Sequence, residues 1–270
     1  MSAPELAILG VGLLCSAGIG PAGASGGQPG QVPGFRARDH VANRKNIKLM
    51  ARSVQLGVAA VGLALEGSPL VAEVPPHRRA MYTGSNPLAS EFGDLRPAIE
   101  AASVQGVLDL QRFASDGVPL IHPLWLVKGL SNNVLGFSSA QQDFQGSNAN
   151  YCHDSASGVL ALWEAGHAVL EGRACLAVAG SSDCMIAAGP LFPGRPMGEG
   201  AAFFLLSGPQ HPSRWRLRLA PPPRLIDYDE AQLGFLGVAG PTVALARAAL
   251  SGMGPCGVVE GDHGITIFTN

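Results

Sequence analysis

The chain has 270 residues, of which 47% are hydrophobic and 14% are charged, and its formal net charge is −2. The apolar content is sufficient for a core on both faces of a sheet. About 25% of the residues of a typical soluble domain are charged, so this low charge indicates a surface that partly contacts another protein, and we expect an oligomer. Outside one short cluster no basic stripe is present, which argues against nucleic acid as a partner.

The basic cluster consists of Arg44, Lys45, Lys48 and Arg52. These residues recur at helical spacing, so the favoured interpretation is a solvated helix face. Docking of an acidic protein is the sharper alternative.

The cysteines indicate a reducing compartment, and we expect the cytoplasm. Their number is odd and no Cys-x-x-Cys spacing occurs, which argues against a disulfide framework and against a zinc site. The apolar start at residues 6–14 lacks a basic segment before it, and no apolar run reaches the roughly 18 residues of a membrane span, so we expect neither a signal peptide nor an anchor. The five cysteines are Cys15, Cys152, Cys175, Cys184 and Cys256.

The predicted elements alternate between strands and helices. The first half contains a strand at residues 6–11, a loop at 18–34, one long buried helix at 43–66, a strand at 79–83 and a helix at 95–110. The second half contains a helix at 159–170, strands at 174–179 and 201–206, an edge strand at 215–219, a helix at 241–250 and two short apolar runs within 257–270. This alternation predicts an α/β protein.

Residues 150–158, Asn-Tyr-Cys-His-Asp-Ser-Ala-Ser-Gly, lie directly before the predicted helix at 159–170. A strand that turns at once into a helix places Ser155 at the helix N-terminus, where unpaired N–H groups favour negative charge. That position suits a nucleophile. The alternative is that Ser155 only caps the helix.

A second stretch, residues 122–133, mixes aromatic and apolar side chains with a polar end at Asn132 and Asn133. It predicts either the wall of a pocket or an ordinary core helix. From composition alone the core helix is favoured.

Five motifs in register resemble the ketoacyl synthase (condensing enzyme) family over most of residues 6–206. They are Ile8-Leu9-Gly10-Val11-Gly12, the segment 44–50, the segment 122–133, Ser155-Ala156-Ser157-Gly158 and Gly198-Glu199-Gly200-Ala201-Ala202. The resemblance implies a thiolase-like fold, with two similar α/β halves in five α/β/α/β/α layers, and dimers formed through the strand before the nucleophile. It implies one ketosynthase-like domain over residues 1–270, with residues 1–206 as the N-terminal half and 207–270 as an abbreviated C-terminal half.

The resemblance also implies a catalytic cysteine at the position of Ser155 and two supporting histidines elsewhere. A serine has a far higher pKa than a thiol and needs a general base. His153 is two residues away, but two residues of extended chain span about 6.6 Å, which exceeds hydrogen-bond reach without a turn. Asp154 would raise the pKa of a nucleophile beside it. Cys152 is a possible shifted nucleophile, although a buried structural cysteine is the commoner case.

The two histidines can be sought in two registers. In the first, residues 259–264 resemble the Glu-Ala-His-Gly motif of the family with one residue too many, which points to His263. In the second, which we prefer, residues 236–240 resemble the segment after the second histidine, so Gly234 takes that histidine's place and the first histidine is deleted. His263 then either faces the turn at Ser155 or is a polar residue of a terminal turn, the favoured interpretation. In both registers a Cys-His-His set is absent.

The sequence therefore predicts a non-catalytic ketosynthase-like subunit, similar to the chain-length-factor partners of bacterial type II polyketide synthases, including short ones of aryl-polyene-type systems. Its partners would be an active ketosynthase and, directly or through that subunit, an acyl carrier protein, and no cofactor is implied. One alternative is an acyltransferase or thioester hydrolase with Ser155 as nucleophile and His153 or His263 as base. Another is a carrier-binding module that uses the basic cluster. The acyl tunnel wall is predicted at Trp125, Leu126, Leu130 and Asn133.

Overall fold

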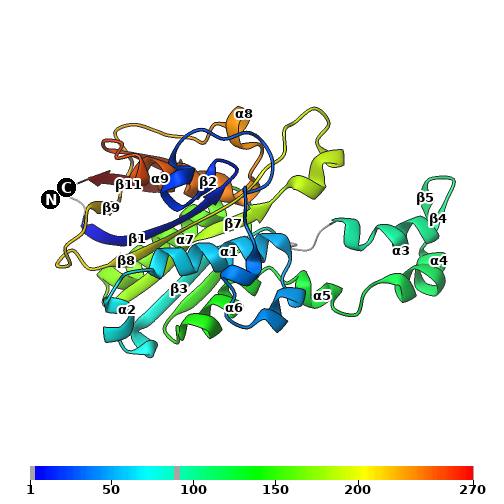
Figure 1. Cartoon of the computed structure of the whole chain (residues 1–270), viewed down its shortest axis with the longest axis horizontal. Helices are drawn as coiled ribbons and strands as arrows, with labels where there is room; N and C mark the ends of the chain where they lie inside the picture. The colour runs from blue at the N-terminus through cyan, green and yellow to red at the C-terminus, as the bar shows by residue number, and fades with distance from the viewer. Residues whose placement is uncertain (1–3, 88–91, 270) are drawn as a thin grey trace.

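The computed structural model describes residues 4–87 and 92–269 and has one nine-stranded sheet at its centre (Figure 1). The strand order is β10-β11-β9-β1-β8-β7-β3-β6, with the short β2 added beside β1. The pairs β3–β7 and β3–β6 are parallel, and the other pairs are antiparallel. The predicted α/β class is confirmed.

The first wing of the sheet is built from the longest apolar runs of the sequence. Its central strands are largely buried on both faces, whereas the edge strand β6 is only partly buried, and α1 (Arg52–Leu65) covers one face together with α6 (Asn133–Gln142). The wing contains β1 (Glu5–Cys15), β2 (Gly18–Ile19), β3 (Arg79–Gly84), β6 (Asn148–Tyr151), β7 (Leu176–Cys184) and β8 (Glu199–Ser207).

The second wing consists of β9 (Trp215–Leu219), β10 (Cys256–Glu260) and β11 (His263–Thr269). Two helices, α7 (Ala156–Leu170) and α9 (Gly240–Leu250), share one core with both wings and so lie between them. Leu217 faces that core, and its neighbours Arg216 and Arg218 point to the opposite, outer face. The described elements therefore form four layers, α/β/α/β, of the five that the resemblance implies, and the outer layer of the second half is the part that is shortened.

A separate arm, residues 92–130, extends from one end of the sheet (Figure 1). It begins beyond residues 88–91 and returns to the body at the start of α6. Its elements are short: α3 (Arg96–Ala101), β4 (Ser103–Val104), β5 (Val107–Leu108), α4 (Leu110–Arg112), a π-helical turn (Phe113–Gly117), a 3₁₀ turn (Val118–Leu120) and α5 (Trp125–Lys128).

Short helical turns connect the remaining elements. They are α2 (Leu70–Glu73), α8 (Glu230–Leu233) and the 3₁₀ turns Gly20–Ala24, Ala37–Asp39, Arg44–Leu49, Pro76–Arg78, Phe92–Asp94, Ile186–Leu191 and Gly237–Ala239.

Three sequence predictions need correction. The helix at 43–66 is a 3₁₀ turn followed by α1, because Met50 is extended (φ −108°, ψ 122°) and buries its side chain. The helix at 95–110 stops after α3, since Gln105 and Gly106 have positive φ (51° and 81°) and turn the chain into the β4–β5 hairpin. The edge strand at 215–219 is β9, which is bonded on both sides, to β1 and to β11.

Candidate functional site

The turn between β6 and α7 lies at the carboxyl ends of the parallel strands β3, β6 and β7, the usual position of a ligand site in an open α/β sheet. β6 ends at Tyr151, and Ser155 directly precedes α7 with near-helical angles (φ −54°, ψ −27°). Residues 152–155 are exposed, whereas Ser157 and Gly158 are buried. Cys152 is thus a surface thiol and not the buried cysteine that the sequence suggested, because the strand ends one residue before it.

Asp154, rather than Ser155, caps α7. The Asp154 Oδ1 accepts from the Ala156 N–H at 2.8 Å, and the Asp154 carbonyl accepts from the Ser157 N–H at 3.1 Å. The Ser157 hydroxyl is used as well, since it accepts from the His153 N–H at 3.0 Å. Among the described residues, the Ser155 side chain makes no capping hydrogen bond. The alternative of Ser155 as a helix cap is therefore wrong.

The buried end of the turn is fixed by packing. A Cβ added to Gly158 would collide with the Ser181 Oγ and would lie 2.6 Å from the Thr242 Cγ2. A Cβ added to Gly84 would lie 2.5 Å from the carbonyl carbon of Ser157. The Ser181 Oγ donates to the Val238 carbonyl at 2.9 Å and lies 2.7 Å from the Thr242 Oγ1, which ties β7 to the start of α9. Ser157 and Gly158 are thus explained without any catalytic role.

His153 is paired with its neighbour and not with Ser155. Its Nδ1 lies 2.9 Å from the Asp154 Oδ2, and the two side chains are 74% and 59% exposed. This hydrogen bond, together with the one from the Ala156 N–H, holds the pKa of the Asp154 carboxyl below its ordinary value. Within the described residues no hydrogen bond joins His153 to the Ser155 hydroxyl.

His263 lies at the start of β11 and packs edge-on against Trp163, with ring centroids 5.2 Å apart. Trp163 follows Ser155 by eight residues, which is about 12 Å of helix rise. The structure therefore does not bring His263 to the turn at Ser155. A serine nucleophile needs an imidazole at hydrogen-bond distance, and neither candidate base is placed there.

Gly234, the position of the second histidine in the preferred register, has no room for a side chain. Its φ is 76° and its ψ is 173°, a region that is accessible essentially to glycine alone. A Cβ would lie 2.5 Å from the carbonyl carbon and oxygen of Met197 and 2.7 Å from the amide nitrogen of Gly198. An imidazole cannot be accommodated there without moving the backbone.

The predicted tunnel residues separate into different environments. Trp125 lines a cavity of about 390 Å³ together with Lys48 and Lys128, and its buried Nε1 has no hydrogen-bond partner among the described residues. Leu126 and Leu130 are 70% and 51% exposed and are not part of that cavity. The Asn133 Nδ2 donates to the carbonyls of Val127 (2.6 Å) and Lys128 (3.3 Å), so Asn133 holds the end of α5.

Two buried carboxylates near the same end of the sheet were not predicted as site residues. Glu199 is fully buried and paired with Arg52 through two hydrogen bonds of 2.6 and 2.9 Å, and it also accepts from the Val32 N–H at 2.8 Å. The sequence signal was the Gly-Glu-Gly motif, but the partner 147 residues away is not visible in a sequence. Glu199 thus connects the start of α1 and the loop at residues 18–34 to β8.

Asp183, at the end of β7, is the second buried carboxylate. It accepts from the Val238 N–H at 3.1 Å, the Asn86 Nδ2 at 3.2 Å and the Cys184 N–H at 2.8 Å. Burial nevertheless raises its pKa above the ordinary value. In the described part of the chain no group of three or more His, Cys, Asp or Glu side chains is placed to hold a metal ion.

Similar solved structures place this geometry in a known fold. A chain from the structure of a type II polyketide-synthase acyl carrier protein in complex with its ketosynthase bound to the hexaketide has a TM-score of 0.69 at 16% identity, with 98% of each chain covered. The ishigamide ketosynthase/chain length factor has a TM-score of 0.70 at 15% identity, again with 98% of each chain covered. A β-ketoacyl synthase from Burkholderia phymatum STM815 has a TM-score of 0.52 at 18% identity, over 77% of this chain and 60% of that one.

The chain thus has the thiolase-like fold of the ketosynthases, and the predicted resemblance is confirmed at the level of the fold. The match to the first two structures extends over almost the whole length of both chains. No protein-family model and no curated protein matches the sequence. No helix among the described residues is long and apolar enough to cross a membrane.

Proposed function

We propose that the chain is a non-catalytic, chain-length-factor-type subunit that pairs with an active ketosynthase. In that complex it would shape the tunnel for the acyl chain during carrier-protein-bound elongation. Among the described residues no base lies beside Ser155, and Gly234 has no room for a side chain; both features support a role without chemistry of its own. We propose further that residues 1–206 and 207–270 are the two halves of one ketosynthase-like domain, and that it acts in the cytoplasm, in keeping with five free cysteines.

The arm carries this proposal. Fourteen large apolar side chains are exposed in the described part of the chain, and ten of them lie between Ile99 and Leu130. Leu110 and Val107 are 75% and 71% exposed. Clustered apolar exposure of this kind marks a protein interface, since monomeric proteins rarely carry large apolar patches. A partner that covers the arm would bury this surface.

A second feature favours the same partner. Within residues 4–87 and 92–269, β6 is the last strand of the sheet, and no described strand pairs with its outer edge, which can pair with a strand of another chain. This is the strand directly before the turn at Ser155, through which the ketosynthase family is expected to dimerise. Leu126 and Leu130, exposed here, would then form part of the tunnel wall with Trp125 once the partner is bound.

The basic residues supply a contact for the carrier. Lys48 lies in the wall of the Trp125 cavity with Lys128, whose Nζ is paired with the Asp94 Oδ2 at 2.9 Å. We propose that an acidic acyl carrier protein reaches the complex beside this wall or through the ketosynthase, with Arg44 and Lys45 as further contacts.

Co-expression with candidate ketosynthases tests the pairing. A one-to-one complex is expected, and Leu110→Glu or Leu126→Glu should weaken it without unfolding the chain, since both side chains are exposed. In the complex the partner would bury each of these leucines, and the loss of one buried leucine costs about 1.5–3 kcal/mol of binding free energy, or roughly 10- to 100-fold in Kd. Leu225→Glu is the matched control, because Leu225 is 68% exposed but lies outside the arm. A soluble homodimer that binds none of the candidate ketosynthases would contradict the proposal.

Ser155→Ala separates this proposal from the acyltransferase alternative. In the complex the variant should support elongation at the wild-type rate, and intact-mass spectrometry after incubation with acyl thioesters should detect no acyl group on this chain. An adduct that disappears in Ser155→Ala would instead assign the chemistry to Ser155.

A further inference from the structure

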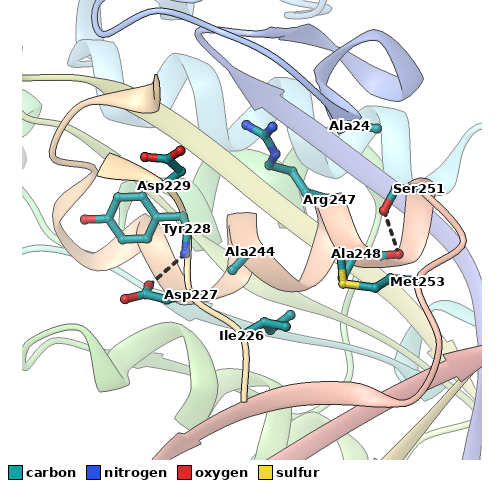
Figure 2. A pocket seen from close by; sticks show the side chains of 10 residues that line it. All are labelled: Ala24, Ile226, Asp227, Tyr228, Asp229, Ala244, Arg247, Ala248, Ser251 and Met253. Atoms are coloured by element: carbon teal, nitrogen blue, oxygen red, sulfur yellow. Dashed lines mark hydrogen bonds between the residues drawn. The ribbon is translucent and has the colours of Figure 1, made fainter. Parts of the chain in front are cut away.

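A cavity of about 200 Å³ lies between α9 and the segment 226–229, outside the turn at Ser155 and outside the arm (Figure 2). A cavity of this size suits a small molecule better than a long acyl chain. The proposed function assigns no role to this cavity.

Charged side chains of opposite sign line opposite walls. Arg247 extends from α9, and Asp227 and Asp229 come from the neighbouring segment, with the Asp227 carboxylate turned away from Arg247 (Figure 2). Among the described residues none of the three forms an ion pair. The Arg247 Nη2 donates to the Gly26 carbonyl at 3.2 Å, and the guanidinium also interacts with the Cys15 thiol. The buried Nη1 makes no well-aligned hydrogen bond in the described part of the chain.

Each carboxylate keeps acceptor capacity for a ligand. The Asp227 Oδ1 accepts from the Tyr228 N–H at 2.8 Å. The Asp229 Oδ1 accepts from the N–H groups of Ala231 (3.0 Å) and Gln232 (3.3 Å), which caps α8. The hydrogen bonds described for these two side chains use only Oδ1, and a carboxylate has about four acceptor sites.

The rest of the lining is apolar. Ala244 and Ala248 are buried on α9, and Ile226 and Met253 complete this surface (Figure 2). A ligand here must therefore combine an anionic group, a cationic group and a short apolar body. A phosphate or a dicarboxylate would bring a second negative charge towards the two aspartates, and a simple carboxylate would leave them unpaired.

We propose that this cavity binds a free α-amino acid with an aliphatic side chain. The carboxylate of the ligand pairs with Arg247, its ammonium group pairs with Asp229, and its side chain packs on the apolar surface. The two opposite walls supply both charge contacts at once, which single-charge ligands cannot use.

Isothermal titration calorimetry on the full chain, alone or in complex with its ketosynthase, tests the proposal with L-leucine. The matched probes are 4-methylpentanoate, which lacks the ammonium group, and isoamylamine, which lacks the carboxylate. Saturable binding of L-leucine is expected, with both probes at least 10-fold weaker. Arg247→Gln and Asp229→Asn should each weaken L-leucine at least 10-fold, and Asn still caps α8. Arg38→Gln, outside the cavity, should leave binding unchanged.

Any one of three results overturns the proposal. The first is no saturable binding of L-leucine. The second is that either single-charge probe binds as tightly as L-leucine. The third is that Arg247→Gln, Asp229→Asn and Arg38→Gln all bind L-leucine with equal affinity. Thermal unfolding of each variant without ligand shows that it is folded, so that a loss of binding reports on the cavity.

Discussion

Gly234 has a backbone conformation and surroundings that exclude any side chain, so its replacement has a large expected cost. Strain in this region of φ and ψ costs about 1–3 kcal/mol before any collision. The contact with the Met197 carbonyl adds to it. We therefore expect Gly234→Ala to lower the free energy of unfolding by more than about 2 kcal/mol, measured by urea denaturation.

Gly252→Ala is the control for Gly234→Ala. Gly252 also has a positive φ (69°), but the nearest atom to an added Cβ is 3.7 Å away, at the flexible end of Arg214. Only the strain of a left-handed residue applies there, about 1–2 kcal/mol. An equal decrease in the free energy of unfolding for Gly234→Ala and Gly252→Ala would contradict the conclusion that Gly234 has no room for a side chain.

Asp183 and Asp154 have pKa shifts of opposite sign, so their replacements should respond to pH in opposite ways. Burial raises the pKa of Asp183 above its ordinary value of 3.8. As the pH rises past 3.8, the carboxyl loses its proton in the unfolded state before it does so in the folded state, so the free energy of unfolding decreases. The hydrogen bond from His153 lowers the pKa of Asp154, so its contribution is present above pH 3.8 and is lost as the pH falls through the lower folded-state pKa.

Urea titrations between pH 3 and pH 7 measure this contrast. As the pH rises, Asp183→Asn should gain stability relative to the wild type, whereas Asp154→Asn should lose it. The same sign for both variants would show that the hydrogen bonds to Asp183 outweigh its burial and that its pKa is not raised.

At the scale of elements, strong apolar periodicity was sufficient for prediction. The strands β3 and β8 and the helices α7 and α9 lie within a few residues of their predicted positions, because each is rich in buried apolar residues. The errors arose where a single residue changes the chain direction. Gln105 adopts a positive φ that side chains rarely allow, so the hairpin that interrupts the predicted helix at 95–110 has only Gly106 as a visible signal.

The free edge of β6 can be tested with the thiols. In the isolated chain iodoacetamide should modify Cys152 and Cys175, which are exposed, and should spare buried Cys15 and Cys256. Cys184 should react slowly too, because burial raises its pKa to about 12. In the ketosynthase complex Cys152 should become protected while Cys175, at the other end of the sheet, stays reactive. Unchanged labelling of Cys152 would exclude β6 as the pairing strand.

At the scale of the whole molecule, the sequence predicted the position of the turn at Ser155 but not its contacts. That His153 pairs with Asp154 is a matter of side-chain orientation, and that His263 packs against Trp163 depends on how the second wing folds over α7. The Arg52–Glu199 pair joins distant parts of the chain. Local patterns report none of these contacts, because tertiary packing decides them.

The arm should make the isolated chain self-associate. Its apolar side chains have no cover within the described residues, so light scattering should detect oligomers that disappear in the double variant Val107→Glu/Leu110→Glu. The expected product is a folded monomer with an unchanged circular dichroism spectrum. Oligomers that persist in this variant would place the self-association surface outside the arm.

The exposed arm also has a consequence for the abundance of the protein in a cell. A partner present at 100 times its Kd adds about 2.7 kcal/mol to the stability of the bound chain, whereas a chain without a partner presents its apolar surface to chaperones and proteases. The steady-state level of this chain should therefore follow that of the proposed ketosynthase partner. Loss of the partner would deplete the chain after translation, with its messenger RNA unchanged.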